Sequence, residues 1–455
     1  MRWLMIAALG LVTSALAPGA LFVGARVAAQ RPALTVPFTQ FTLDNGLNVI
    51  LHRDASVPVV AVNLWYHVGS ANERVGRTGF AHLFEHVMFE GSMHVPEGEF
   101  DNWLEAAGAN NNGSTNNDRT NYYIDLPSNA LELALFLESD RMGFLLDDKA
   151  PAKVDGQRDV VKNEKRQSVD NQPYGQAFVE LASLLYPPAH PYSWPVIGSM
   201  EDLSAASFED VAAFFRTYYV PNNASLVIAG DIDIAGTRAL VEKWFADVPR
   251  GKPVARLSPP TPVLDGVKQK TISDRVQLPR LYLAWHTPAL FKPGDAAMDV
   301  VSSLLTGGKN ARLYRRLVYD LQIAQDVSAF QQSQALGGSF VIMATARPGQ
   351  TLSAIQTVID EELDALRKSP PEAREMTRAL NQTEASFFRG MERVGGFGGK
   401  ADRLNAYFAS TGTPDYFEKD LARYRAVTAV EVQEAVTKYL VKDRRVELGV
   451  VPGEK

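Results

Sequence analysis

The feature that most constrains the fold of this chain is a spacing of 221 residues that recurs between its two halves. This spacing separates Pro58, in VPVVAVNLWYH, from Pro279, in LPRLYLAWH. The same spacing separates Tyr218, in FFRTYYVPNNASLVIAG, from Tyr439, in AVTKYLVKDRRVELGVV. Because two pairs of distant segments share one offset, the sequence predicts a duplicated unit of strands and helices.

The chain is long enough for two hydrophobic cores. It has 455 residues, and about 425 remain once the N-terminus is set aside, which suits two domains of about 200 residues each. The stretch 250–266, RGKPVARLSPPTPVLDG, is rich in proline and lacks hydrophobic periodicity, so we interpret it as a linker. We therefore expect one domain over residues 30–249 and a second over residues 267–455.

Local patterns predict individual strands and helices. Asn45-Gly46 lies between two β-prone segments, 41–43 and 47–51, and predicts a two-residue hairpin turn. Hydrophobic spacing further predicts strands at 59–68 and 224–229 and helices at 128–142 and 210–218.

The segment His82-Leu83-Phe84-Glu85-His86 concentrates two imidazoles and a carboxylate in five positions. It follows a glycine-containing turn and is expected to be helical, so residues four apart lie one above the other. His82 and His86 can then direct ring nitrogens at one divalent metal ion. Glu85 can face a water molecule on that metal without being a ligand. The order H-x-x-E-H is the reverse of the common H-E-x-x-H zinc protease motif.

A histidine on a helix is more often hydrogen-bonded in the core or at the surface than bound to a metal, so the motif needs a third ligand. The charged segment 155–170, DGQRDVVKNEKRQSVD, is expected to form a second helix anchored by Val160 and Val161. Glu164 projects from its polar surface. Catalytic zinc prefers three protein ligands and one open position for water, and Glu164 would complete that set.

Only the first half of the chain carries the motif. Shifted by the offset of 221 residues, the three polar motif positions fall on Ser303, Thr306 and Gly307. None of these three is a typical zinc ligand. We therefore expect the second half to form a wall of the binding chamber without binding a metal.

The motif stands within a longer resemblance to the pitrilysin family of zinc metallopeptidases, in the short two-domain form related to mitochondrial processing peptidase and its bacterial periplasmic relatives. The segments that carry it follow the order and spacing of that family over residues 40–232: FTLDNGLNVILHRDASVPVVAVNLWYHVGSANE, RTGFAHLFEHVMFEGS, NEKRQSVDNQPYG, HPYSWPVIGSMEDL and YYVPNNASLVIAGD. The second half, including GGKNARLYRRL at 307–317, resembles the family's C-terminal domain more loosely. The resemblance implies an α+β fold of two homologous αβ domains, each a mostly antiparallel sheet packed against helices.

The resemblance also implies roles for the polar residues. In that family two histidines and a later glutamate bind zinc, and the glutamate inside the motif is the catalytic base. Carried over, His82, His86 and Glu164 would bind one Zn2+ and Glu85 would act as the base.

The polar run 110–116, NNNGSTN, has two interpretations. Taken alone it would be a polar loop. The resemblance instead implies an edge strand that pairs with an extended peptide through its main chain. In that interpretation the residues that bind substrate are Asn112, Gly113, Ser114 and Thr115.

Three positions depart from the family pattern. Seven residues before the metal glutamate the family commonly has a second glutamate, whereas this chain has Gln157, which would support the site by hydrogen bonding alone. The family's C-terminal half usually supplies an arginine and a tyrosine that hold the substrate carbonyl, and the matching positions are Val318 and Gln325. We therefore expect a dimer in which a related non-zinc subunit supplies this clamp, with a homodimer as the alternative. Local substitution by the segment 314–316, Tyr-Arg-Arg, is a further possibility.

Residues 1–29 read as an export signal, because Arg2 precedes an apolar run over 3–16 and small residues follow before Gln30. An uncleaved membrane anchor is the alternative. The chain has no cysteine, so it carries neither a lipobox nor a disulfide. Its net charge of -6 argues against nucleic-acid binding. A periplasmic or secreted protein fits these features.

The sequence thus predicts an exported zinc-dependent endopeptidase that hydrolyses peptides or unfolded polypeptides as the zinc-bearing subunit of a dimer. The glycine-rich segment 395–400, GGFGGK, lacks the spacing and the Ser or Thr of a P-loop, and we interpret it as a flexible loop. A non-catalytic assembly or chaperone-like subunit is the alternative function. A structural metal site is a third, although it would give Glu85 no purpose.

Overall fold

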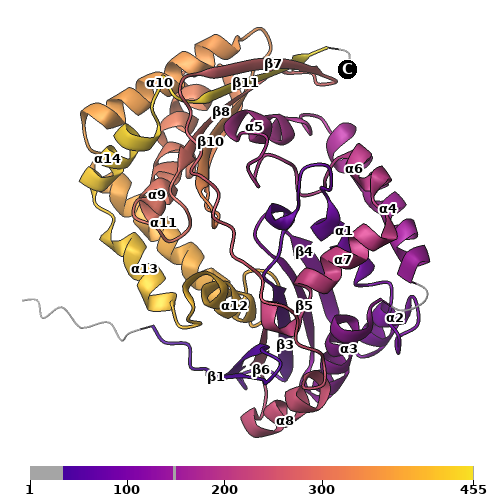
Figure 1. The fold of residues 1–455 in the computed structure, drawn as a ribbon. Helices are drawn as coiled ribbons and strands as arrows, with labels where there is room; N and C mark the ends of the chain where they lie inside the picture. The colour runs from indigo at the N-terminus through magenta and orange to yellow at the C-terminus, as the bar shows by residue number, and fades with distance from the viewer. Residues whose placement is uncertain (1–33, 147–149, 454–455) are drawn as a thin grey trace, which may run out of the picture. The chain divides into compact units, whose positions relative to one another are not determined.

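The computed structural model describes residues 34–146 and 150–453, which contain two β-sheets with helices packed on them (Figure 1). The predicted export signal at residues 1–29 lies outside the described residues. Within the described residues, no helix combines the length and the apolar character needed to cross a membrane.

The first sheet has six strands in the order β1-β2-β6-β3-β5-β4. β2 and β6 are parallel, and the other neighbouring pairs are antiparallel. β4 is an edge strand, with β5 as its neighbour in the sheet. The strands are β1 (Thr39–Thr42), β2 (Asn48–Arg53), β3 (Val59–Tyr66), β4 (Asn110–Thr115), β5 (Thr120–Pro127) and β6 (Ala224–Gly230).

The second sheet repeats the pattern of the first without its outer strand β1. Its order is β7-β11-β8-β10-β9, with β11 and β7 parallel and the other pairs antiparallel. Each strand therefore has a counterpart at the same place in the first sheet, which confirms the predicted duplication and the α+β class. The strands are β7 (Lys268–Asp274), β8 (Arg280–Thr287), β9 (Ala324–Gln332), β10 (Gly338–Ala346) and β11 (Val446–Pro452).

One face of the first sheet forms the first hydrophobic core. Alternate residues of β3, such as Val62 and Leu64, are fully buried in it, as the two-residue period of a strand requires. The helices of this half are α1 (Phe80–Val87), α2 (Glu99–Ala106), α3 (Leu131–Phe144), α4 (Ala150–Lys165), α5 (Ala177–Leu185), α6 (Met200–Ala205), α7 (Phe208–Tyr218) and α8 (Ile234–Phe245).

The second sheet buries side chains on both faces. Leu283 and Trp285 of β8 point into the second core, whereas Tyr282 lies on the other face, in a cluster with Leu181 of α5. The helices of this half are α9 (Asp295–Thr306), α10 (Leu352–Lys368), α11 (Ala373–Met391), α12 (Lys400–Thr411), α13 (Phe417–Ala426) and α14 (Ala429–Tyr439).

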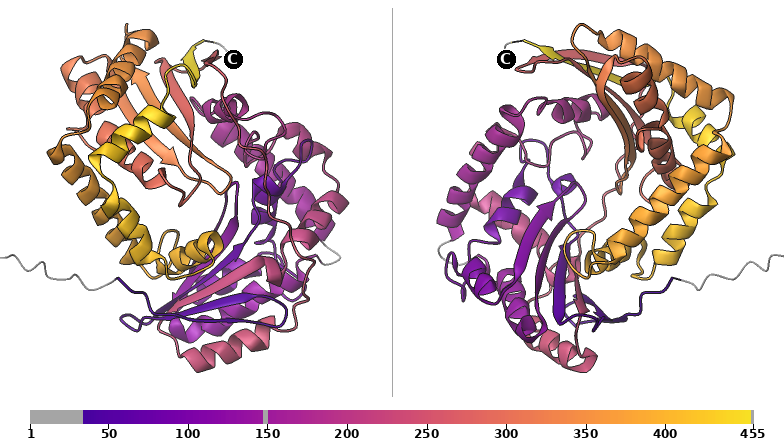
Figure 2. Two further views of the ribbon diagram at one scale, coloured as in Figure 1. Left: turned by 60° about the vertical axis from the view of Figure 1, so that its left-hand side comes forward. Right: turned by 180° about the vertical axis from the view of Figure 1, so that it is seen from behind.

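Helix α12 lies against the first sheet rather than the second (Figures 1 and 2). Its Asn405 is fully buried and donates hydrogen bonds to the backbone oxygens of Asn63 and Ser225, at 3.0 and 3.1 Å. The face of the first sheet opposite the core is thus covered by polar contacts from the second half of the chain.

Three local features can be compared with the sequence prediction. The loop between β1 and β2 is longer than a two-residue turn, because Thr42 pairs with Asn48 and Gly46, at φ +94°, bonds back to Leu43. Helix α4 continues beyond Lys165 as a wider π-helical turn. Residues 110–115 form β4, as the resemblance implied, and not a loop.

Candidate functional site

Helix α1 is fixed at its N-terminus by a glycine and a buried carboxylate. Gly79 has φ +90°, and a Cβ atom there would lie 2.8 Å from the backbone oxygen of Ile197, so a larger residue does not fit. The Glu73 carboxylate accepts hydrogen bonds from the backbone N–H groups of Gly79 and Ala81, at 2.9 and 2.8 Å. These bonds satisfy donors that the first turn of a helix leaves open.

The sequence of α1 separates an apolar face from a polar one. His82, Glu85 and His86 lie on the polar face and remain partly exposed. The apolar face is buried in the first core by Phe80, Ala81, Leu83, Phe84 and Val87. The packing of this face therefore directs the three polar side chains away from the core.

Glu164 of α4 brings a carboxylate to both histidines. Its Oε2 lies 3.6 Å from Nε2 of His82 and 3.3 Å from Nε2 of His86. Among the residues that the structure describes, these three make the one group of His, Cys, Asp or Glu side chains close enough to share a metal ion. The side chains are 12%, 26% and 41% exposed in the order His82, His86, Glu164, so the group can be reached from solvent.

The donor set and its spacing fit zinc. Zinc bonds to His nitrogen and carboxylate oxygen are about 2.0–2.2 Å long, so two ligand atoms at corners of a regular tetrahedron lie about 3.3–3.6 Å apart. The separations of Glu164 Oε2 from the two histidine nitrogens have these values. Three protein ligands also leave the fourth corner free, as in a catalytic site.

The two histidines differ electrostatically. Burial and the neighbouring His86 lower the pKa of His82 to about 4, so its imidazole is neutral near pH 7. Burial also lowers the pKa of His86, but the adjacent Glu164 carboxylate outweighs it and the net shift is upward. A neutral imidazole is the form that binds metal. Burial raises the pKa of the third motif residue, Glu85.

Gln157 lies beside the histidine pair. Its side chain hydrogen-bonds His86, and its Nε2 donates to Glu90 Oε1 at 2.6 Å. A hydrogen bond such as the one to His86 fixes the tautomer and the orientation of a metal-binding imidazole. A neutral amide thus occupies the position where the resemblance leads one to expect a carboxylate.

Glu85 lies directly against strand β4. The Thr115 side chain hydrogen-bonds its carboxylate. A Cβ atom on Gly113 would lie 3.1 Å from Cγ of Glu85, so the strand and the helix meet closely at that glycine. Two of the four predicted substrate-binding residues therefore touch the predicted base.

Alternate residues of β4 direct their backbone groups towards the open edge of the sheet. Beyond the strand, the N–H of Asn116 donates to the backbone oxygen of Arg119 across the turn, at 3.0 Å. Bonded and non-bonded positions alternate along an antiparallel pair, so Gly113 and Thr115 direct their backbone groups away from β5. Asn112 is exposed, and its Oδ1 accepts from the N–H of Gly113 at 2.8 Å.

The two positions expected for the oxyanion clamp hold neither an arginine nor a tyrosine. Val318 is buried, and Gln325 is exposed on β9. The nearby Arg315 pairs with Asp320, at 3.5 Å. Arg316 is engaged by the carboxylates of Glu361 and Glu362 on α10. Both arginines are thus paired with carboxylates of the second half.

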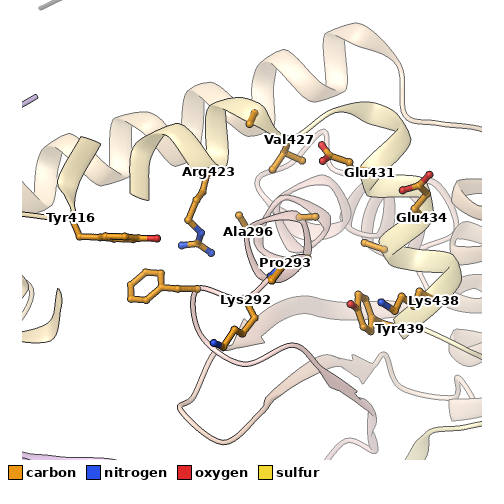
Figure 3. Close-up of a pocket in the computed structure, with 15 residues that line it drawn as sticks. Lys292, Pro293, Ala296, Tyr416, Arg423, Val427, Glu431, Glu434, Lys438 and Tyr439 are labelled. Carbon is orange, nitrogen blue, oxygen red and sulfur yellow. The ribbon is translucent and has the colours of Figure 1, made fainter. Parts of the chain in front are cut away.

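A separate cavity of about 490 Å³ lies in the second half, between the loop before α9 and helices α13 and α14 (Figure 3). Its most prominent cation, Arg423, is already paired with Asp295 and Asp420, at 2.7 Å each. None of the predicted site residues lines this cavity.

Comparisons with known proteins decide the family. A model described as "Insulinase (Peptidase family M16)" matches residues 48–184, and one described as "Peptidase M16 inactive domain" matches residues 205–383. The zinc protease PqqE of Helicobacter pylori is 30% identical over 361 residues, which cover 77% of this chain and 79% of that protein. The chain belongs to peptidase family M16. The second M16 model begins within the first half, after the metal motif, and extends into the second half as far as residue 383.

Other M16 relatives include a subunit of a complex. The probable mitochondrial-processing peptidase subunit beta of Arabidopsis thaliana is 24% identical over 91% of this chain and 78% of its own length. The structure is also similar to that of a protease from Helicobacter pylori, with a TM-score of 0.82 and 25% identity over 92% of this chain and all of the other. The periplasmic protease PqqL of Escherichia coli has the same fold, with a TM-score of 0.74 and 19% identity over 92% of this chain and 48% of PqqL.

Several residues around the site were not found from the sequence. Glu73 is separated from the motif by a turn and has no distinctive pattern around it. Arg119 donates to the backbone oxygen of Ser114 at 2.7 Å, and Asp402 reaches the same region from α12. These contacts depend on tertiary packing, so no local signal marks them.

Proposed function

We propose that this M16 protein is an exported zinc metalloendopeptidase that hydrolyses peptides or unfolded polypeptides. His82, His86 and Glu164 would hold the metal, and Glu85 would be the catalytic base. The observation that supports this most directly is the approach of Glu164 Oε2 to both histidine nitrogens at tetrahedral spacing, beside a glutamate that faces an open strand edge.

The chemistry divides between the metal and the side chains. A zinc ion supplies Lewis acidity, which polarises the scissile carbonyl and makes water acidic enough to attack near neutral pH. Glu85 takes a proton from the attacking water and delivers it to the departing amine. The raised pKa of Glu85, caused by burial, favours both steps, because the carboxyl group can bind and release a proton closer to neutrality.

The substrate would bind as an added strand on β4. The backbone groups of Gly113 and Thr115 face the open edge, where Asn112 Oδ1 holds the Gly113 N–H in the free protein, and both residues lie against Glu85. An extended peptide paired there brings its own backbone to the base. Main-chain pairing gives affinity with little side-chain selectivity, which favours unfolded chains over folded proteins.

The division of the chain follows from the same proposal. Residues 30–249 would form the metal-bearing domain, 250–266 the linker and 267–455 the domain without a metal site. Residues 250–267 contain no helix or strand, which supports this assignment. We place the protein in the periplasm, because residues 1–29 have the pattern of an export signal and PqqL is described as periplasmic.

A dimer would complete the site. This chain has Val318 and Gln325 at the expected clamp positions, so a related subunit with an arginine and a tyrosine would stabilise the oxyanion. The resemblance to a processing-peptidase subunit supports a heterodimer. Weak peptide hydrolysis by the purified chain alone, restored by the second subunit, is the expected result.

The decisive experiment compares two variants of the protein purified with its native partner. Glu85→Gln should keep one zinc per chain by elemental analysis and lose hydrolysis of an unfolded peptide by orders of magnitude. His82→Ala should lose the zinc as well. Full activity in Glu85→Gln, or full zinc content in His82→Ala, would refute the proposed roles.

The absent clamp also favours a second function, a non-catalytic assembly subunit. Such a protein would bind zinc and peptide without hydrolysis in every complex that it forms. Zinc content and peptide hydrolysis, measured with and without a chelator, separate the two functions.

A further inference from the structure

We propose that Asp402, on helix α12 of the second half, is a positioning residue for the substrate strand β4. The inference rests on the proposed role of β4 in binding peptide. It assigns to the half without metal ligands a direct influence on the site, through hydrogen bonds that cross from α12 to the first sheet.

The link begins with one carboxylate oxygen. Asp402 Oδ1 accepts a hydrogen bond from Nδ2 of Asn121 on β5, at 2.9 Å. It also accepts from Nε1 of Trp65, at 3.0 Å, on the neighbouring strand β3. The second oxygen, Oδ2, accepts from the backbone N–H of Gly398 at 2.8 Å. The carboxylate therefore joins the glycine-rich loop and α12 to two strands of the first sheet.

Asn121 connects Asp402 to β4 through a hydrogen bond with Ser114. Its Oδ1 accepts a hydrogen bond from the Ser114 hydroxyl at 2.6 Å, and Ser114 is its partner in the register. Nη1 of Arg119 donates to both the hydroxyl oxygen and the backbone oxygen of Ser114, at 2.7 Å each. Asn121 is fully buried, so its amide has no water to replace these partners.

The hydrogen bonds that connect Asp402, Asn121, Ser114 and Arg119 can be donated in only one direction. A carboxylate only accepts and a guanidinium only donates. Asp402 therefore turns the Asn121 amide so that its N–H faces α12 and its oxygen faces Ser114. The Ser114 hydroxyl must then donate to Asn121, which leaves its lone pairs for Arg119. Asp402 and Arg119, which carry opposite charges, thus lie at the two ends of this series of hydrogen bonds.

Ser114 is the residue through which these hydrogen bonds affect the substrate-binding strand. It lies between Gly113 and Thr115, whose backbone groups face the open edge and which both contact Glu85. The hydrogen bonds to the hydroxyl and the backbone oxygen of Ser114 fix the backbone conformation of the strand between those two residues. Loss of Asp402 frees the Asn121 amide to rotate and releases Ser114.

The second half also holds the end of the hairpin that β4 and β5 form. Nε2 of Gln334 donates to Asn117 Oδ1 at 2.7 Å, and the backbone N–H of Ala335 donates to Asp118 Oδ2 at 2.9 Å. With its tip anchored in this way, the hairpin stays in place when Asp402 is removed. The expected change is therefore local to β4.

Hydrogen–deuterium exchange of the full chain tests the link without substrate or turnover. Asp402→Ala should raise exchange in peptides covering 110–116 by about tenfold, the size expected for loss of a hydrogen bond to a charged group. Lys400→Ala is the matched control, because Lys400 lies on the same helix and pairs with Asp54 of the first half, away from Asn121 and Ser114. It should leave exchange in β4 unchanged. Equal effects of both variants on β4, or no effect of Asp402→Ala, would overturn the proposal.

Ser114→Ala provides a second variant that removes the other end of the link with little risk to folding. Its effect on β4 exchange should not add to that of Asp402→Ala, whereas the same effect should appear in full when it is combined with Lys400→Ala. In the active complex, Asp402→Ala should raise KM for an unfolded peptide about tenfold with a smaller change in kcat and unchanged zinc content. An unchanged KM in an active complex overturns the positioning role. A wild-type complex that hydrolyses nothing refutes the proposed function instead, and exchange alone then decides the link.

Discussion

Cγ of Glu85 lies 3.1 Å from the point where a Cβ atom would stand on Gly113. The ring of Tyr122 is at the same distance from that point, so the space above the glycine is closed on two sides. Any side chain at position 113 must displace either the predicted base or a buried aromatic ring. The absence of a side chain at this position is therefore a requirement of the contact between α1 and β4.

Gly113→Ala is expected to lower kcat for peptide hydrolysis by about tenfold to a hundredfold, because small displacements of a catalytic group carry costs of this size. Zinc content should stay at one ion per chain, since none of the three ligands is touched. Gly156→Ala is the control, because a Cβ there meets nothing within 4 Å and alanine favours a helix. Equal kcat values for wild type and Gly113→Ala would show that Glu85 does not depend on this contact.

Gln157→Leu should weaken zinc binding by about 10- to 100-fold, the usual effect of removing a partner of a metal-binding imidazole. Gln157 bonds His86 and also donates to Glu90, so leucine leaves both without that partner. Competition with a fluorescent chelator measures the affinity. Gln172→Leu, at an exposed position, should bind zinc as the wild type does.

Much of the fold was predictable because it depends on patterns that the chain repeats. The offset that relates Pro58 to Pro279 anticipates two sheets that share the order of five strands. The spacing within His82–His86 anticipates two imidazoles on one helical face, because that relation needs only local geometry. The approach of Glu164 to these rings needed the packing of two helices, and the resemblance supplied it where spacing alone could not.

The contacts that cross between the halves could not be predicted from the sequence. Asp402 meets Asn121 although 281 positions separate them, and neither lies in a distinctive motif. The polar run over 110–115 was ambiguous for a related reason. Its residues have low β propensity, and pairing with β5 decides their conformation. The turn after Thr42 is longer than predicted because β-strand register, and not the Asn-Gly pair, sets its length.

Removal of zinc should lower the thermal stability of the protein. At free zinc about 100 times the dissociation constant, binding stabilises the folded state by about 2.7 kcal/mol, which corresponds to a shift in Tm of about 5–10 °C for a domain of this size. Differential scanning calorimetry with and without a chelator measures the shift. In His82→Ala the chelator should have no effect, and a shift of the same size in that variant would point to a metal site elsewhere.

His286 should make the protein less stable in mild acid. Burial lowers its pKa to about 4, and Nε2 donates to the backbone oxygen of Leu185 at 3.0 Å. The unfolded chain, with an ordinary histidine pKa of about 6.5, binds the proton more readily than the folded protein. The stability from neutral His286 is therefore complete above about pH 6.5 and is lost as the pH falls towards 4. Between about pH 7.5 and pH 5 this group should cost about 1–2 kcal/mol of unfolding free energy, after allowance for its partial exposure.

His286→Gln isolates that contribution, because a glutamine amide can donate to Leu185 and does not titrate. Urea unfolding at the two pH values should show a smaller loss of stability in the variant than in the wild type. Some loss should remain, because burial lowers the pKa of His67 to about 4 as well. Metal-free protein is used for both, so that zinc release in acid does not contribute. The same acid dependence in both proteins would mean that His286 is protonated as readily in the folded state as in the unfolded one.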